Sequence, residues 1–191
     1  MTILIIGLVI FIGTHCLSIF RGARVQLVGQ LGEGGFKGSY GAASLLGLGL
    51  IIWGFSLYRA QGMIQIWYPP TWTRHLALTL MWFAFVALVS GYTGPGKIVG
   101  WLRHPMLVAV KIWALAHLLA NGDLGGMLLF GSLLAFAVVD RIAVKRRGDL
   151  GKAGTASFGQ GDALAVAFGT LAYGTVLYLH PWLFGVAIIG I

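Results

Sequence analysis

The sequence predicts an all-α integral membrane protein, a single domain over residues 1–191 built as a bundle of about six transmembrane helices. Composition is the first reason, because 58% of the residues are hydrophobic and only 9% are charged. A soluble domain of this size has roughly 25% charged residues. The second reason is that the apolar residues gather into segments about 20 residues long, the length a helix needs to cross a bilayer. The mean hydropathy of +0.89 agrees with both.

Each predicted span ends where charged or turn-forming residues begin. The first lacks the basic region and cleavage site of a signal peptide, so we expect it to be retained. The fourth opens on His104-Pro105, and proline is well tolerated in a first helical turn. Asn121-Gly122-Asp123 predicts a tight turn that makes the fourth and fifth spans an antiparallel hairpin. The six spans cover roughly residues 2–20, 39–58, 75–92, 104–120, 123–140 and 161–180.

The segments between the spans differ in character. Two glycine-rich connections, around 29–38 and 148–161, are predicted to be flexible loops. The tail after His180-Pro181 is too short to cross again, and we expect it to lie against the bundle or in the interface. Small residues four positions apart let helix backbones approach closely. Three such pairs predict packing faces: Ala43 and Gly47, Gly131 and Ala135, and Ala165 and Gly169.

The basic residues predict how the chain is oriented. With both termini outside, ten lysines and arginines fall in inner loops and only Arg59 and Arg74 in outer loops. This is a strong positive-inside bias. We therefore expect a multi-pass protein of the inner membrane with periplasmic termini. A chain of five spans with a re-entrant end would instead place the C-terminus inside. The ten inner residues are Arg21, Arg24, Lys37, Lys97, Arg103, Arg141, Lys145, Arg146, Arg147 and Lys152.

Two histidines inside predicted spans, His15 and His117, are the leading candidates for a functional site. An ionisable side chain within a membrane segment is costly and by default suggests function. The structural alternative is that each imidazole simply hydrogen-bonds a carbonyl or hydroxyl across a helix interface. With two such residues in one small bundle, both interpretations stay open.

If the two histidines bind a cofactor, haem suits them better than zinc. A structural zinc site needs four Cys, His or carboxylate ligands, and the spans offer no such cluster. Haem needs only one or two axial ligands and a dry cavity between helices. His15 and His117 on facing helices predict such a pair, although their depths in the membrane differ by up to about 10 Å at 1.5 Å per residue. A haem with one protein ligand is the alternative.

Other polar residues in the spans are weaker candidates. Lys111 lies deep in the fourth span, where it either snorkels or meets a partner such as a haem propionate or a buried acid. His104 is as consistent with an interfacial helix start as with function. Asp123 and Asp162 each stand at the beginning of a span, where the helix dipole favours negative charge. Asp140 adjoins a basic loop, and we expect it to stay hydrated.

The sequence also excludes several classes of function. It contains no nucleotide-binding glycine motif, no serine hydrolase motif and no zinc peptidase motif. The net charge of +8 follows from basic residues placed between apolar spans, so it indicates membrane topology and not nucleic-acid binding.

Three segments carry a family resemblance. GTHCLSIFR, RHPMLVAVKIWALAHLLANGD and HPWLFGV resemble, in order and spacing, segments of the NnrU family of bacterial membrane proteins. The resemblance implies a link to denitrification, through nitrite and nitric oxide reduction. A relative of that family, zeta-carotene isomerase, is a haem b enzyme whose ligands resemble His15 and His117 in position.

Three hypotheses follow, and whether the protein is an enzyme stays open among them. The first is a haem b protein that acts in nitrogen-oxide respiration, with His15 and His117 as axial ligands and a nitrogen oxide as a possible ligand. The second is a membrane isomerase of an apolar polyene. The third is a haem-free assembly factor that binds respiratory reductase subunits.

Overall fold

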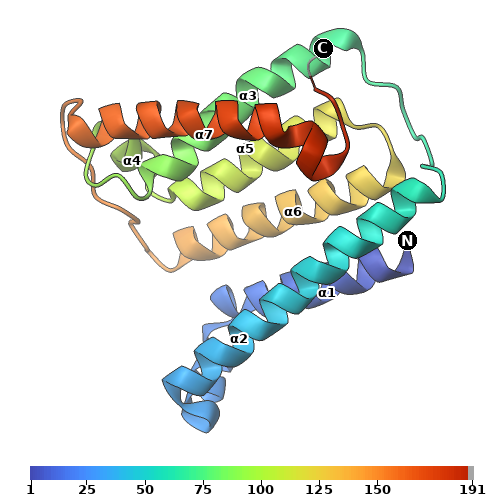
Figure 1. Ribbon diagram of the computed structural model, residues 1–191. Helices are drawn as coiled ribbons and strands as arrows, with labels where there is room; N and C mark the ends of the chain where they lie inside the picture. The colour runs from blue at the N-terminus through green and yellow to red at the C-terminus, as the bar shows by residue number, and fades with distance from the viewer. Residues whose placement is uncertain (189–191) are drawn as a thin grey trace. The chain divides into compact units, whose positions relative to one another are not determined.

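The computed structural model describes residues 1–188 as helices joined by short connections (Figure 1). This confirms the predicted all-α class. Contacts divide the chain into two compact units. The first contains Met1–Pro70 and His117–Gly148, and the second contains Thr71–Ala116 and the residues from Asp149 onward. Residues 189–191 of the predicted C-terminal tail lie outside the described part.

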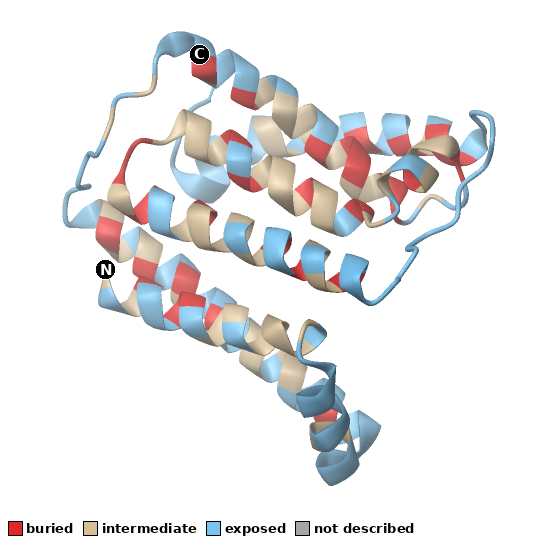
Figure 2. Ribbon diagram, turned by 180° about the vertical axis from the view of Figure 1, so that it is seen from behind, coloured by how far each residue is buried: buried red, intermediate tan, exposed pale blue. Residues whose placement is uncertain are grey.

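The first unit consists of α1 (Thr2–His15), the short 3-10 helix η1 (Cys16–Ser18), α2 (Arg21–Ala60), the end of α5 (Pro105–Ala120) and α6 (Leu124–Arg146). Glycines let α1 and α2 lie in direct backbone contact. A Cβ added to Gly7 would stand 2.6 Å from the backbone nitrogen of Ile51, and one added to Gly47 would stand 2.8 Å from that of Phe11. The two helices are therefore antiparallel, and Leu4 and Ile51 lie in the small core between them. The buried faces of these helices are red in Figure 2.

The second unit consists of α3 (Thr71–Ser90), α4 (Lys97–Leu102), most of α5 and α7 (Gln160–Phe184). Here α3 and α7 are the close pair, since a Cβ on Gly169 would stand 2.8 Å from the Cα of Val86. The Trp82 indole donates to the hydroxyl of Thr170 at 2.9 Å. The close approaches at Gly47 and Gly169 confirm two of the predicted small-residue faces. Nothing lies within 4 Å of a Cβ built on Gly131, so the third face is not used within residues 1–188.

The lengths of the helices support four of the six predicted spans and leave the other two as predictions. Four of them, α2, α3, α6 and α7, are long and apolar enough to cross a membrane. The other two apolar segments form shorter helices, α1 with 14 residues and α5 with 16. At 1.5 Å per residue these are about 21 and 24 Å long, less than the roughly 30 Å of a hydrocarbon core.

The prediction of a flexible loop at 29–38 is wrong. These residues are helical and belong to α2, which is interrupted only at Gly32, where φ is 71° and ψ is 165°. A residue without Cβ adopts this backbone conformation at little cost. The glycines on both sides of it remain helical. The second predicted connection is confirmed as irregular, because α6 ends at Arg146 and α7 begins at Gln160.

The predicted helix starts are also present, whereas residues 121–123 form no regular turn and the Gly122 carbonyl instead accepts from the backbone N–H groups of Ile66 and Trp67. Asp123 is the N-cap of α6 and accepts a hydrogen bond from the backbone N–H of Gly126 at 2.8 Å. Asp162 accepts from the N–H groups of Gly159, Lys97 and Ile98 at 2.7–2.9 Å, so one buried carboxylate caps both α7 and α4. As predicted, α5 begins at Pro105.

Candidate functional site

His15 is the last residue of α1, and one hydrogen bond fixes its imidazole. Nδ1 lies 2.8 Å from the backbone carbonyl oxygen of Phe11, one turn earlier in the same helix. A carbonyl oxygen only accepts, so in the neutral imidazole Nδ1 carries the proton and Nε2 keeps its lone pair. Histidines that bind metals commonly show this arrangement, in which one nitrogen donates to the backbone and the other ligates.

Aromatic rings from three helices surround this imidazole. The ring centroids of Phe11, Tyr40 and Phe136 lie 4.2, 5.5 and 6.1 Å from that of His15. They come from α1, α2 and α6, so the setting of His15 depends on the packing of the first unit. The sequence alone does not reveal Tyr40 and Phe136, because neither carries a signal beyond being an aromatic residue in an apolar helix.

A polar group lies directly beyond His15. The hydroxyl of Ser18 is 2.7 Å from the backbone oxygen of His15 and 3.2 Å from Oδ1 of Asp140. Asp140 is buried, with 8% of its surface exposed, so the expectation that it stays hydrated is wrong. The guanidinium of Arg147 donates to the backbone oxygen of Ser18 at 3.2 Å. These bonds tie the end of α1 to the end of α6.

His117 lies in the last turn of α5 and belongs to the same unit as His15. Its ring stacks on Phe130 of α6, with centroids 4.5 Å apart and an interplanar angle of 27°. Its backbone oxygen accepts from both the backbone N–H and the side-chain amide of Asn121. The asparagine of the quoted N-G-D segment thus ends the helix that carries His117.

The two histidines contact α6 at different levels. His15 lies against Phe136 and His117 against Phe130. Six residues of helix span about 9 Å, similar to the offset expected from the sequence. Within residues 1–188, no group of three or more His, Cys, Asp or Glu side chains could hold a metal ion.

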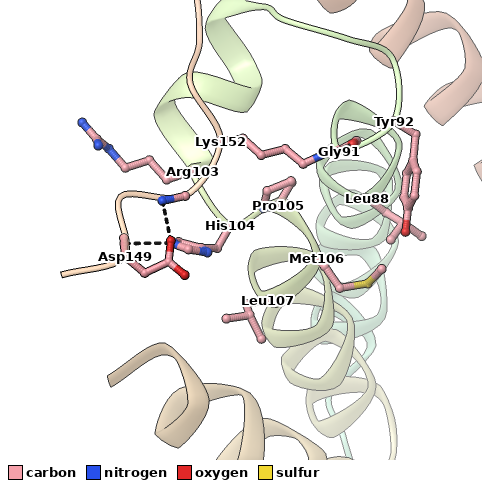
Figure 3. A pocket seen from close by; sticks show the side chains of 11 residues that line it. Leu88, Gly91, Tyr92, Arg103, His104, Pro105, Met106, Leu107, Asp149 and Lys152 are labelled. Carbon is pink, nitrogen blue, oxygen red and sulfur yellow. Dashed lines mark hydrogen bonds between the residues drawn. The ribbon is translucent and has the colours of Figure 1, made fainter. Parts of the chain in front are cut away.

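The structure places the other two predicted site residues in the second unit. Lys111 is half-buried on α5, six residues before His117. At 100° per residue the two side chains leave the helix about 120° apart, so they do not share a face. His104 directly precedes the first residue of α5 and lines a cavity of about 310 Å³ within that unit (Figure 3).

The cavity at His104 is formed by a strained turn and the loop that follows α6. Nε2 of His104 lies 3.3 Å from the backbone oxygen of Asp149. Arg103 has a φ of 59°, unusual for a residue with a side chain, and its carbonyl accepts from the backbone N–H of Lys152 at 2.7 Å. The ammonium of Lys152 donates to the carbonyl of Gly91. These contacts give His104 a structural role in joining the loop to the start of α5.

Comparison with known proteins completes the description. No curated protein and no solved structure matches the chain. A family model described as NnrU protein matches residues 3–188, nearly the whole chain and parts of both units. The chain therefore belongs to the NnrU family.

Proposed function

We propose that this protein binds haem b in its membrane bundle, with Nε2 of His15 as an axial ligand and His117 as the second. The observation that carries the proposal is the hydrogen bond from Nδ1 of His15 to the carbonyl of Phe11. It directs the proton to Nδ1 and leaves Nε2 as a lone-pair donor without any rearrangement.

The residues around His15 support a flat, apolar cofactor. Phe11, Tyr40 and Phe136 present ring surfaces on three helices, and such surfaces exclude water from a bound macrocycle. When bound, haem would supply an iron that changes oxidation state, and nitric oxide would have a position on it only where His117 does not ligate. With the family's link to denitrification, this favours a role in nitrogen-oxide respiration, alone or beside reductase subunits.

The two histidines should contribute unequally. His15 has a fixed tautomer and an aromatic surround, whereas His117 contacts α6 about 9 Å further along that helix. We therefore expect His15 to determine whether haem binds, and His117 to determine whether the iron has a sixth ligand.

Absorption spectroscopy of the purified full-length protein, expressed in haem-replete cells, tests the proposal. The unaltered protein should show a Soret band, and His15→Ala should lose it. His117→Ala should keep the band but shift it to the high-spin form. His75→Ala is the matched control, because His75 is an exposed histidine at the start of α3, and it should leave the spectrum unchanged. A colourless preparation would contradict haem binding and favour the haem-free assembly factor.

We also propose an inner-membrane location with both termini in the periplasm, on the basis of the ten-to-two distribution of basic residues. Alkaline phosphatase fused to the C-terminus should then be active in intact cells. A fusion that is inactive, while a green fluorescent protein fusion at the same position fluoresces, would refute this orientation.

A further inference from the structure

A second candidate site lies in the first unit, where η1 joins the start of α2 and the end of α6. A hollow of about 420 Å³ opens there. Ser18, Tyr40 and Asp140 form part of its wall. Its other polar side chains are all basic and exposed: Arg21, Arg24, Lys37 and Arg147.

The local backbone is what gathers these basic side chains. The break at Gly32 turns the first part of α2 back toward the part that follows. As a result the guanidinium of Arg24 lies 5.6 Å from the ring centroid of Phe36. Arg147 reaches the same place from the end of α6 and donates to the backbone oxygen of Ser18 at 3.2 Å. Three of the four cations thus contact the protein, because Lys37 also pairs with Glu33 at 3.1 Å.

The positive charge of the hollow is only partly compensated by carboxylates. The sequence has only five acidic residues. Asp123 and Asp162 bind backbone N–H groups at helix starts, and Asp149 binds one in its loop. Glu33 pairs with Lys37 at 3.1 Å. Asp140 is the one carboxylate that lines the hollow.

We propose that the hollow binds the phosphate of an anionic phospholipid. Guanidinium groups form paired, charge-assisted hydrogen bonds with phosphate oxygens, and basic pockets between membrane helices bind anionic headgroups. Leu17, Phe36 and Val144 give the same hollow an apolar wall, which suits a ligand that carries acyl chains. A free phosphate ion would use the cations but gain nothing from that wall.

This proposal does not depend on haem, because neither His15 nor His117 lines the hollow. Native mass spectrometry of the full-length protein in nonionic detergent, titrated with phosphatidylglycerol or phosphatidylcholine, measures the binding directly. The test variant is Arg24→Gln with Arg147→Gln. The matched control is Arg141→Gln with Arg146→Gln, which removes the same amount of charge at residues of α6 that do not line the hollow.

The unaltered protein and the control should retain phosphatidylglycerol in preference to phosphatidylcholine. The test variant should bind phosphatidylglycerol at least about tenfold more weakly, since it loses guanidinium–phosphate hydrogen bonds. Circular dichroism should show the same helix content in both variants, and haem content should be unchanged.

Three results would overturn the proposal. The first is equal retention of phosphatidylglycerol by the test variant and the control. The second is displacement of the lipid by inorganic phosphate at an equal concentration, which would make the hollow a site for the free anion. The third is loss of haem from the test variant with lipid binding unchanged, which would assign the cations to the carboxylates of haem.

Discussion

The hydrogen bond between His15 and Phe11 decides which nitrogen of the His15 imidazole is available for chemistry. Its donor and acceptor are one helical turn apart, so it forms as soon as α1 forms. The cost of placing an ionisable group in lipid is sufficient to select His15 and His117 from the sequence. The same reasoning does not predict Tyr40, Phe136 or Asp140 as their neighbours, because those contacts join helices distant in sequence.

Asp162 gives a residue-scale prediction about stability. Its carboxylate accepts three backbone N–H groups, from Lys97, Ile98 and Gly159, and is buried. Asparagine offers one acceptor oxygen and no charge, so Asp162→Asn should lower the free energy of unfolding by about 2 kcal/mol. Thermal unfolding in detergent, followed by tryptophan fluorescence, measures the change.

Glu33→Gln provides the comparison for Asp162→Asn. Both substitutions replace a carboxylate with an amide, but the carboxylate of Glu33 is exposed and pairs with Lys37 on the same helix. Its loss should cost no more than about 0.5 kcal/mol. Equal effects of the two substitutions would show that the cap shared by α4 and α7 does not stabilise the second unit.

At the scale of helices, the first unit depends on the backbone contact between α1 and α2. A Cβ on Gly47 would stand 2.8 Å from the nitrogen and 2.9 Å from the Cα of Phe11. These are backbone atoms that cannot move without separating the helices, so Gly47→Ala should destabilise the protein by about 1–3 kcal/mol. Gly49, two residues further along α2, has nothing within 4 Å of a built Cβ.

The contrast between these two glycines is measured in the same unfolding experiment. Gly49→Ala should be neutral, or stabilising by up to about 1 kcal/mol, because alanine is the better helix former. If Gly47→Ala unfolds at the same temperature as Gly49→Ala, the close approach of α1 to α2 is not what holds the first unit together.

The helices also show where local reasoning from the sequence fails. That the apolar segments are helical follows from their length and hydropathy. Small residues four positions apart in the sequence also identify the close contacts at Gly47 and Gly169. Glycine content wrongly suggests a loop at 29–38, because the low helix propensity of glycine leaves only Gly32 non-helical there. The six-residue α4 is apolar but much shorter than a membrane span, and Asp162 stabilises its start from far along the chain.

At the scale of the whole molecule, the scarcity of acidic residues connects the proposals. With five acids and thirteen lysines and arginines, most cations have no carboxylate to pair with. Charge patterning therefore predicts the orientation in the membrane from the sequence, and it also leaves a basic hollow in the first unit. The hollow itself is not predictable from sequence, because it requires η1, the turn at Gly32 and the end of α6 to come together.

Ligation of haem iron by the imidazole of His15 is the central claim, and chemical rescue of His15→Gly tests it most directly. The variant leaves space where the ring stood, so free imidazole added at millimolar concentration has room to take its place. We predict that the purified variant, supplied with haem, lacks the six-coordinate Soret band and that imidazole restores it. His75→Gly, treated in the same way, should show the unaltered spectrum with or without imidazole. A six-coordinate spectrum in His15→Gly before imidazole is added would contradict the claim.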